Sequence, residues 1–200
     1  MSFSDFKTIS QVQTEYQVKY DDVGFIQKVK ADISKQFLSE MEFNIKMLDA
    51  FSSEAARCEL IILPILREAY KKFSLTFSLW VQKPISYDNN LNGTPDYIIS
   101  KRSILGKTVL EFPLLIVVKA KKNDFDQGWA QCLAELVTAQ KLNGDDKLPV
   151  YGIVTDGKYW EFGELTDKLF NKNSHSFIID DLFELFGALN YIFTLAEQNI

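Results

Sequence analysis

The 200-residue sequence is poor in the residues that most readily identify a function. Its two cysteines, Cys58 and Cys132, lie in apolar segments with helical spacing, where a free thiol acts as a small hydrophobe. The single histidine, His175, lies in a polar loop, so neither a zinc site nor a catalytic histidine is expected. The sequence also has no phosphate-binding loop, dinucleotide-binding glycine pattern or nucleophile elbow. These absences argue against the enzyme classes that a short motif alone would identify.

Long apolar runs are absent as well. The longest two, Leu60–Leu66 and Phe112–Val118, have seven residues each, whereas roughly 20 are needed to cross a bilayer. The first residues, Met1–Asp5, have neither a basic start nor an apolar core, so no secretory signal is expected. We therefore expect a cytoplasmic protein without a membrane partner.

Positive charge is not in excess either. A net charge of -5 at pH 7 argues against the broad basic surface of a strong, nonspecific nucleic-acid binder, although it leaves room for a local basic groove. A hydrophobic content of 46% over 200 residues is that of an ordinary globular protein with a sizeable core. We expect a single domain over residues 1–200.

The most informative positive feature is a pair of expected strands with charged residues at their ends. The first, 93–99, contains Asp96, and the second, 112–118, is a continuous apolar run typical of a strand buried on both faces. The second strand runs directly into Lys119 and Lys121, which share one face because side chains alternate along a strand. Two ammonium groups on one face need acids nearby. Asp96 is a candidate, since short connections usually pair consecutive strands.

These residues resemble the motif of the PD-(D/E)XK nuclease superfamily, the restriction-endonuclease-like proteins. In that family a Pro-Asp on one strand and an acid-x-Lys on the next hold a divalent metal beside a catalytic lysine. Asp96 matches the aspartate and Lys121 the lysine, whereas the position of the second acid is Lys119. The resemblance covers roughly residues 52–163 and implies an α/β fold with an αβββαβ core, in which helices flank a central mixed sheet.

The resemblance also implies the remaining members of the site. It assigns the acid of the preceding helix to Glu59 and gives Asp96 and Glu59 the role of metal ligands. It makes Lys121 the catalytic lysine and places a polar side chain, Gln131 or Gln127, on the helix that follows. Mg²⁺ is the implied cofactor of an active enzyme, and no cofactor is implied for an inactive one.

Formal charges single out Lys119. An intact cluster of three acids and one lysine carries about -2 and calls for a divalent cation. In this chain Glu59, Asp96, Lys119 and Lys121 sum to zero, so salt bridges alone can satisfy the site. The ammonium group of Lys119 would then occupy the volume of the metal, which should bind weakly.

A carboxylate from elsewhere in the chain is an alternative ligand. Glu135 or Glu111 would supply it if Lys119 swings away. Glu135 lies two turns beyond Gln127 on the expected polar face of its helix, and otherwise we expect it to be solvated.

Basic and amide side chains near the strand ends are candidates for nucleic-acid contact, although surface lysines there are usually only solubilising. These candidates are Lys122, Gln127, Lys101, Arg102 and Lys107.

The helix before the first strand carries the acid that completes the motif. Ser52 or Ser53 is the expected cap, and Pro64 removes one hydrogen bond and bends the helix. At about 100° per residue, Glu59 projects within about 50° of the centre of the apolar stripe, whereas Glu54 lies near its border. An inward carboxylate is costly unless it is paired or binds a cation.

The other expected elements complete the organisation of the chain. A helical extension covers about 1–50, with apolar residues every four positions over 25–37. Asn123 or Asp124 caps the helix after the second strand, and Asp156-Gly157 is a strong hairpin signal. A C-terminal helix is expected over about 180–198. Its apolar stripe is compatible both with packing on the sheet and with a homodimer.

We therefore expect a nuclease-like protein that is catalytically impaired and acts as a nucleic-acid-binding or interaction module, with DNA as the expected nucleic acid. The alternative is an active Mg²⁺-dependent endonuclease that hydrolyses DNA phosphodiesters with a rearranged acid. A third interpretation takes Lys119 as a recent or engineered change in an otherwise active enzyme.

Overall fold

The computed structural model describes residues 2–122 and 124–200. Over these residues the chain forms a mixed sheet of eight strands in the order β1-β9-β8-β7-β6-β5-β2, with β10 paired to β8. A separate hairpin consists of β3 (Ile85–Ser86) and β4 (Asn92–Gly93). The strands of the sheet are β1 (Lys19–Asp22), β2 (Phe77–Val81), β5 (Tyr97–Lys101), β6 (Leu114–Ala120), β7 (Val150–Thr155), β8 (Tyr159–Thr166), β9 (Leu169–Lys172) and β10 (Phe177–Ile178).

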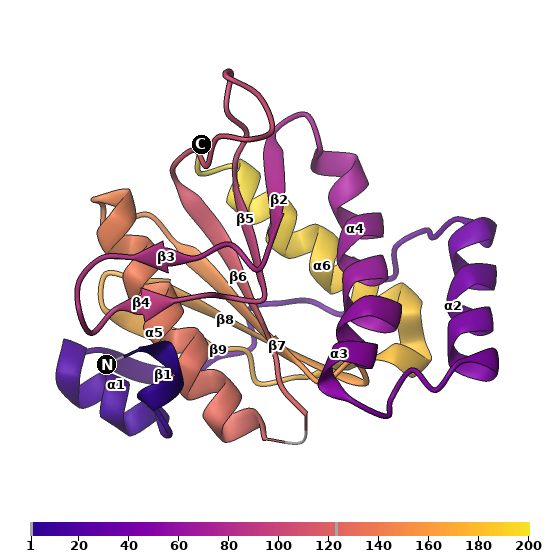
Figure 1. Cartoon of the computed structure of the whole chain (residues 1–200), viewed down its shortest axis with the longest axis horizontal. Coiled ribbons are helices and arrows are strands. Elements are labelled where there is room, and N and C mark those ends of the chain that lie inside the picture. Colours follow the sequence, from indigo (N-terminus) through magenta and orange to yellow (C-terminus); the bar gives the residue numbers. More distant parts are fainter. Residues whose placement is uncertain (1, 123) are drawn as a thin grey trace.

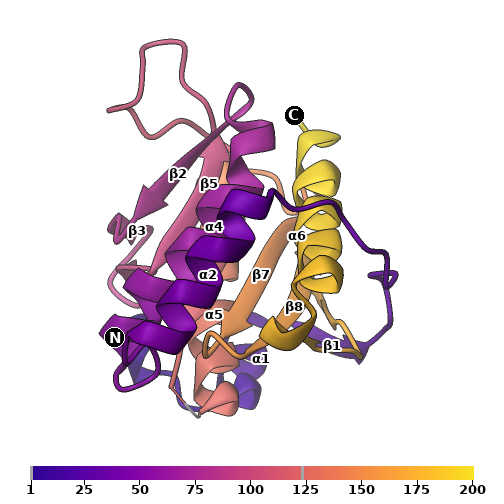
Figure 2. The same cartoon turned by 90° about the vertical axis from the view of Figure 1, so that its right-hand side faces the viewer.

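Helices cover both faces of the sheet (Figure 1). One face carries α2 (Lys35–Met47), α3 (Glu54–Arg57), α4 (Leu63–Tyr70) and α6 (Leu182–Glu197). Figure 2 shows α4 and α6 side by side along this face. The other face carries α5 (Phe125–Asn143) and, outside it, α1 (Ile9–Tyr16) and the short 3-10 turn η1 (Phe3–Asp5). Each face has its own cluster of buried apolar side chains.

The middle of the sheet contains the two strands of the motif. β5 pairs antiparallel with both β2 and β6, whereas β6 pairs parallel with β7. Helix α5 makes the long connection that a parallel pair requires. Apart from the β3–β4 hairpin, the elements follow one another in the expected order α4, β2, β5, β6, α5 and β7. The expected α/β class, with a mixed sheet flanked by helices, is confirmed.

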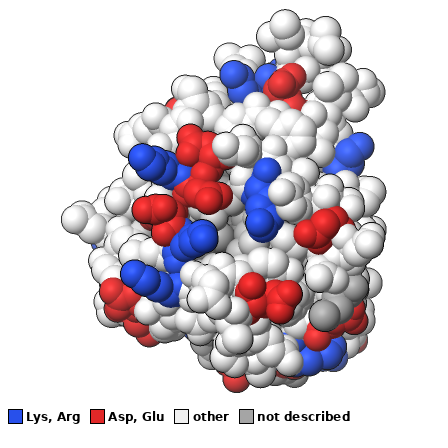
Figure 3. Space-filling model, turned by 90° about the vertical axis from the view of Figure 1, so that its left-hand side faces the viewer, with Lys and Arg blue, Asp and Glu red and all other residues white. Residues whose placement is uncertain are grey.

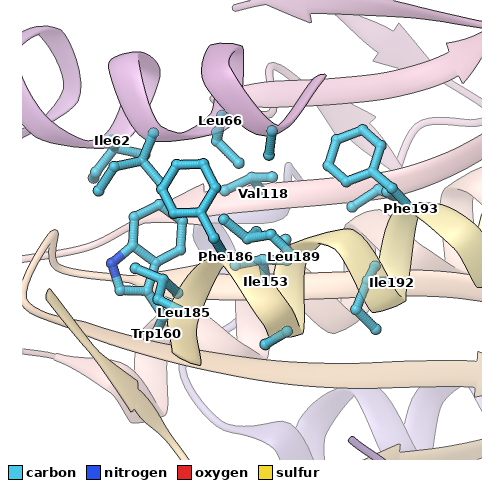
Figure 4. Close-up of a cluster of buried hydrophobic side chains, with 14 of the residues drawn as sticks. Ile62, Leu66, Val118, Ile153, Trp160, Leu185, Phe186, Leu189, Ile192 and Phe193 are labelled. Carbon is cyan, nitrogen blue, oxygen red and sulfur yellow. The ribbon is translucent and has the colours of Figure 1, made fainter. Parts of the chain in front are cut away.

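The C-terminal helix packs on the sheet. Its apolar stripe is buried against α4, the π turn η2 (Cys58–Ile62) and the strands. The homodimer stays a prediction. None of the described helices is long and apolar enough to cross a membrane. Figure 4 shows the packing of this stripe, with Ile62, Leu66, Val118, Ile153, Trp160, Leu185, Phe186, Leu189, Ile192 and Phe193 labelled.

The N-terminal extension is less helical than expected. The four-residue spacing over 25–37 predicts a helix, but residues 23–34 form neither helix nor strand, and α2 begins only after them. This segment runs along α6 instead, where the N–H of Ala31 donates to the carbonyl oxygen of Phe183 at 3.0 Å. Phe25 and Ile33 of the apolar repeat pack against the core on this face, whereas Val29 is exposed, so the four-residue spacing does not mark one face of a helix.

Candidate functional site

Two strands bring Asp96 and Lys119 together. Asp96 directly precedes β5, and Tyr97 pairs with Val118 of β6, so the Asp96 carboxyl group lies beside Lys119. Oδ2 of Asp96 is 3.1 Å from Nζ of Lys119. The same oxygen accepts the N–H of Ala120 at 2.9 Å. Both the backbone and a side chain of β6 therefore hold this carboxylate.

A second carboxyl group approaches Lys119 from α5. Oε1 of Glu135 lies 4.0 Å from Nζ of Lys119, while Oε2 has no hydrogen-bond partner among the residues that the structure describes. The side chains of Lys119 and Asp96 are 15% and 19% exposed, whereas that of Glu135 is 1% exposed. The ammonium group therefore lies between one accessible and one fully buried carboxyl group.

The prediction that Glu135 is a solvated helix residue is wrong, because α5 is enclosed on both sides. Every residue from Gly128 to Gln140 is buried. The sheet covers one side of the helix, and η1 and α1 cover the other, where Phe3 and Val12 join the same apolar cluster as α5. The segment that contains η1 and α1 is polar in sequence, yet it packs over α5 and so helps to bury the polar side chains of this helix.

Burial and charge set the protonation states at the site. Burial raises the pKa of Glu135 to about 8, with the charge of Lys119 acting against this and that of Asp96 adding to it. For Lys119, burial lowers the pKa, but the charges of Glu135 and Asp96 outweigh burial and the pKa is raised overall. Near pH 7 the ammonium group of Lys119 is therefore charged, and the carboxyl group of Glu135 is protonated in most molecules.

Lys121 follows the end of β6 on the same face as Lys119. Its N–H donates to the carbonyl oxygen of Thr155 at 2.9 Å. A Cβ atom on Gly128 would lie 3.3 Å from Cβ of Lys121 and 2.8 Å from Cγ1 of Val154, so a glycine is needed where the lysine stem passes the helix. Within residues 2–122 and 124–200, Lys121 makes no ion pair, in contrast to Lys119.

Glu59 does not point inward as predicted, because its side chain is exposed. The cause is a π-helical turn, η2 (Cys58–Ile62), between α3 and α4. The N–H of Leu63 donates to the carbonyl oxygen of Cys58, five residues back. This wider turn changes the face that each side chain occupies, so the angular spacing of a regular α-helix misplaces Glu59.

Pro64 explains where the π turn occurs. Because proline has no N–H, the carbonyl group of Leu60 loses its helical donor, and the side-chain amide of Asn44 donates to it at 2.8 Å instead. The hydroxyl group of Tyr97 donates to the carbonyl oxygen of Cys58 at 3.3 Å. Pro64 was therefore the sequence signal for this turn, although it was expected only to bend the helix.

Glu54 is the acid of the first helix that acts on the site. Its charge contributes to the raised pKa of Lys119, and its Oε2 accepts the N–H of Lys122 at 3.3 Å. Nζ of Lys122 donates to the carbonyl oxygen of Ser52 at 2.9 Å. Lys122 therefore ties the end of β6 to the start of α3.

The amide side chains of α5 lie in a row that ends at Glu135. Gln127, Gln131 and Glu135 occupy successive turns, with Gln127 half-buried and Gln131 buried. Asp124 caps the helix as expected, since its Oδ1 accepts the N–H of Gln127 at 3.0 Å. Asn123, the other expected cap, lies outside the described residues. The catalytic role implied for Gln131 stays a prediction.

The basic residues expected to contact nucleic acid do not form one surface. Lys101 and Arg102 lie at the opposite end of β5 from Asp96, about 16 Å away along the strand. The guanidinium group of Arg102 donates to the carbonyl oxygen of Ser74. Figure 3 shows a face of the molecule on which acidic and basic side chains are interspersed without a continuous basic area. Lys101 and Arg102 are therefore not part of the Asp96 site.

The donor set does not fit a divalent metal while Lys119 occupies this position. Magnesium prefers several oxygen ligands in a regular arrangement, and the described part of the chain has no group of three or more histidine, cysteine, aspartate or glutamate side chains that could hold a metal ion. A divalent ion 4 Å from an ammonium group would be repelled by about 8 kcal/mol at an effective dielectric constant of 20. The ammonium group of Lys119 therefore occupies the space beside the Asp96 carboxylate.

No family model matches the sequence, and no curated protein matches it at a significant level. The likeness to the PD-(D/E)XK superfamily therefore depends on Asp96, Lys121 and the order of the surrounding elements.

Proposed function

We propose that this chain is a nuclease-like protein of the PD-(D/E)XK superfamily that does not hydrolyse phosphodiesters and acts as a nucleic-acid-binding or interaction module. The position of Lys119 carries the proposal. Its Nζ lies 3.1 Å from Oδ2 of Asp96 and 4.0 Å from Oε1 of Glu135. An ammonium group at this point engages the oxygen atoms that a catalytic metal would need.

The charge balance supports the same conclusion. With Glu135 counted instead of the exposed Glu59, the ionised side chains of Asp96, Glu135, Lys119 and Lys121 again sum to zero. When Glu135 is protonated, the cluster carries one positive charge. Lys121 then provides an ammonium group, without an ion pair among the described residues, that can contact a phosphate.

A cleavage assay tests the loss of hydrolysis. Plasmid and single-stranded DNA are incubated with Mg²⁺ or Mn²⁺ and the unmodified chain, the Lys119→Glu variant, or the Lys107→Glu variant as a matched charge reversal in an exposed loop. We expect cleavage only with Lys119→Glu, because this change returns an acid to the motif position. Robust cleavage by the unmodified chain that Asp96→Ala abolishes would overturn the proposal.

A binding assay without metal tests the second part. Fluorescence anisotropy with labelled single- and double-stranded oligonucleotides is measured in EDTA. We expect Lys121→Ala to weaken binding at least several-fold, since the Lys121 ammonium group is the proposed phosphate contact. Lys72→Ala, at an exposed lysine outside the candidate contacts, should leave binding unchanged. If neither the unmodified chain nor any variant cuts or binds nucleic acid, the functional analogy fails even though the fold stands.

The burial of Glu135 favours one second candidate, an active Mg²⁺-dependent endonuclease with a rearranged acid. In this case Lys119 swings away and Glu135 replaces the motif acid beside Asp96. Cleavage by the unmodified chain would then be lost in both Glu135→Gln and Asp96→Asn. Under the first proposal the unmodified chain does not cleave DNA, so neither substitution changes the result of the assay.

A further inference from the structure

The carboxyl group of Glu135 is the least satisfied polar group at the site. Its side chain is 1% exposed and Oε1 lies 4.0 Å from Nζ of Lys119. Oε2 has no hydrogen-bond partner in the part of the chain that the structure describes. A carboxylate removed from water costs free energy unless it is paired or binds a cation. Within the described residues, Lys119 is the only cationic side chain within 4.0 Å of it.

Asp96 and Glu135 converge on one point although they come from different elements. Asp96 lies at the start of β5 and Glu135 in the middle of α5, while β6 between them carries Lys119. The ammonium group is the contact that both carboxyl groups share. Oxygen atoms from two elements therefore locate this positive charge, as protein oxygen atoms locate a bound cation.

We propose that Asp96 and Glu135 form a cation site whose built-in occupant is the ammonium group of Lys119, and that the site binds an external hard cation once this occupant is removed. The inference rests on the proposed function, which gives the ammonium group the position of a metal ion, and deepens it by assigning the second carboxylate to Glu135. In the native chain Glu135 is a positioning residue that holds Lys119 where it blocks a metal.

The variant Lys119→Ala tests the site by emptying it. Its melting temperature is measured at a series of pH values up to about 9.5, because burial raises the pKa of Glu135 and the variant lacks the charge of Lys119 that lowers it in the unmodified chain. The probes are Mg²⁺ and n-butylammonium, which replaces the deleted atoms. We expect a saturating concentration of either cation to raise the melting temperature by about 3 °C or more in this variant. The unmodified chain should not respond.

Two further variants separate a cation site from a general ion effect. Lys119→Met fills the same volume without a charge, so it is expected not to respond to either cation. Adding Glu135→Gln to Lys119→Ala should abolish the response. The inference is overturned if Lys119→Ala does not respond, if the unmodified chain responds equally, or if the response survives Glu135→Gln.

Hydrogen exchange of the Lys119 ammonium group provides a readout that does not depend on the folding of Lys119→Ala. Nitrogen-15 NMR follows this exchange in the otherwise unmodified chain. Glu135→Gln is expected to accelerate it several-fold, with Lys121 as an unaffected internal control, and an unchanged rate would contradict the inference. If the unmodified chain does not bind nucleic acid, the proposed function fails, but the melting-temperature response and the hydrogen-exchange rate still test the cation site.

Discussion

Among the described residues, a buried ion pair and a partly buried one are satisfied to very different degrees. The first joins Arg57 of α3 to Asp156 of the β7–β8 turn at 3.3 Å, with both side chains 8% exposed. Oδ1 of Asp156 also accepts the N–H groups of Lys158 and Tyr159. The guanidinium group donates further to the carbonyl oxygen atoms of Asp156 and Phe51. Both oxygen atoms of this carboxylate therefore have partners, whereas Nε of Arg57 has none among the described residues.

The second pair, between Lys119 and Asp96, is completed only loosely by Glu135. Nζ is 3.1 Å from one carboxylate and 4.0 Å from the other, and one buried oxygen atom of Glu135 has no partner among the described residues. The two clusters therefore serve different ends. The Arg57 pair fastens a helix to a hairpin, whereas the Lys119 cluster contains a buried carboxyl group with a raised pKa and, among the described residues, one oxygen atom without a partner, a combination that is common at functional sites.

The largest effect is expected from breaking the satisfied pair. Arg57→Met should lower the free energy of unfolding by about 3 kcal/mol, because it leaves Asp156 buried without its cation. Urea unfolding measures this loss. The control is Arg67→Met, which breaks a well-exposed pair with Glu40 and should have little effect. A loss below about 1 kcal/mol for Arg57→Met would remove the distinction between the two pairs.

The corresponding change in the second pair should cost less. We expect Lys119→Met to lower the free energy of unfolding by about 1 kcal/mol. Glu135 can accept a proton when the ammonium group is absent, and Asp96 keeps both the N–H of Ala120 and access to water. Urea unfolding near pH 7 tests this. A loss equal to that of Arg57→Met would show that Lys119 is as structural as Arg57.

A third effect, spread over several pH units, should be a dependence of stability on pH that belongs to Glu135. Its pKa is raised from 4.5 to about 8 in the folded protein, so the folded protein binds more protons than the unfolded chain between these values. The free energy of unfolding contributed by Glu135 should therefore fall as pH rises through this window, by at most about 1.4 kcal/mol per pH unit. Glu135→Gln should remove this fall in urea titrations at a series of pH values. Parallel pH profiles for the two proteins would contradict the burial of an ionisable group here.

Local patterns predicted the sheet at the site well. The apolar run before Lys119 is a strand, and Asp156-Gly157 forms the expected turn between β7 and β8. These predictions succeeded because alternation and turn chemistry depend on a few adjacent residues. The pairing of Asp96 with Lys119 also followed from strand order and was found.

The helical members of the site were harder to predict, for two physical reasons. Glu59 was misplaced because the π turn before Pro64 breaks the regular spacing of an α-helix. Glu135 was judged to be solvated because its burial depends on η1 and α1, which lie more than a hundred residues away in the chain. A helical wheel assumes a regular α-helix and ignores distant segments. The faces of these two helices therefore could not be assigned from their own residues alone.

The position of Lys119 between two carboxyl groups also has a genetic consequence. Lysine and glutamate codons differ only in their first base, so a single nucleotide substitution can replace the ammonium group with a third acid beside Asp96 and Glu135. The chain thus stands one point mutation from the charge pattern of a metal centre, with the surrounding acids already in place. At such a site a change between an ammonium group and a third acid is an easily reversed step in evolution.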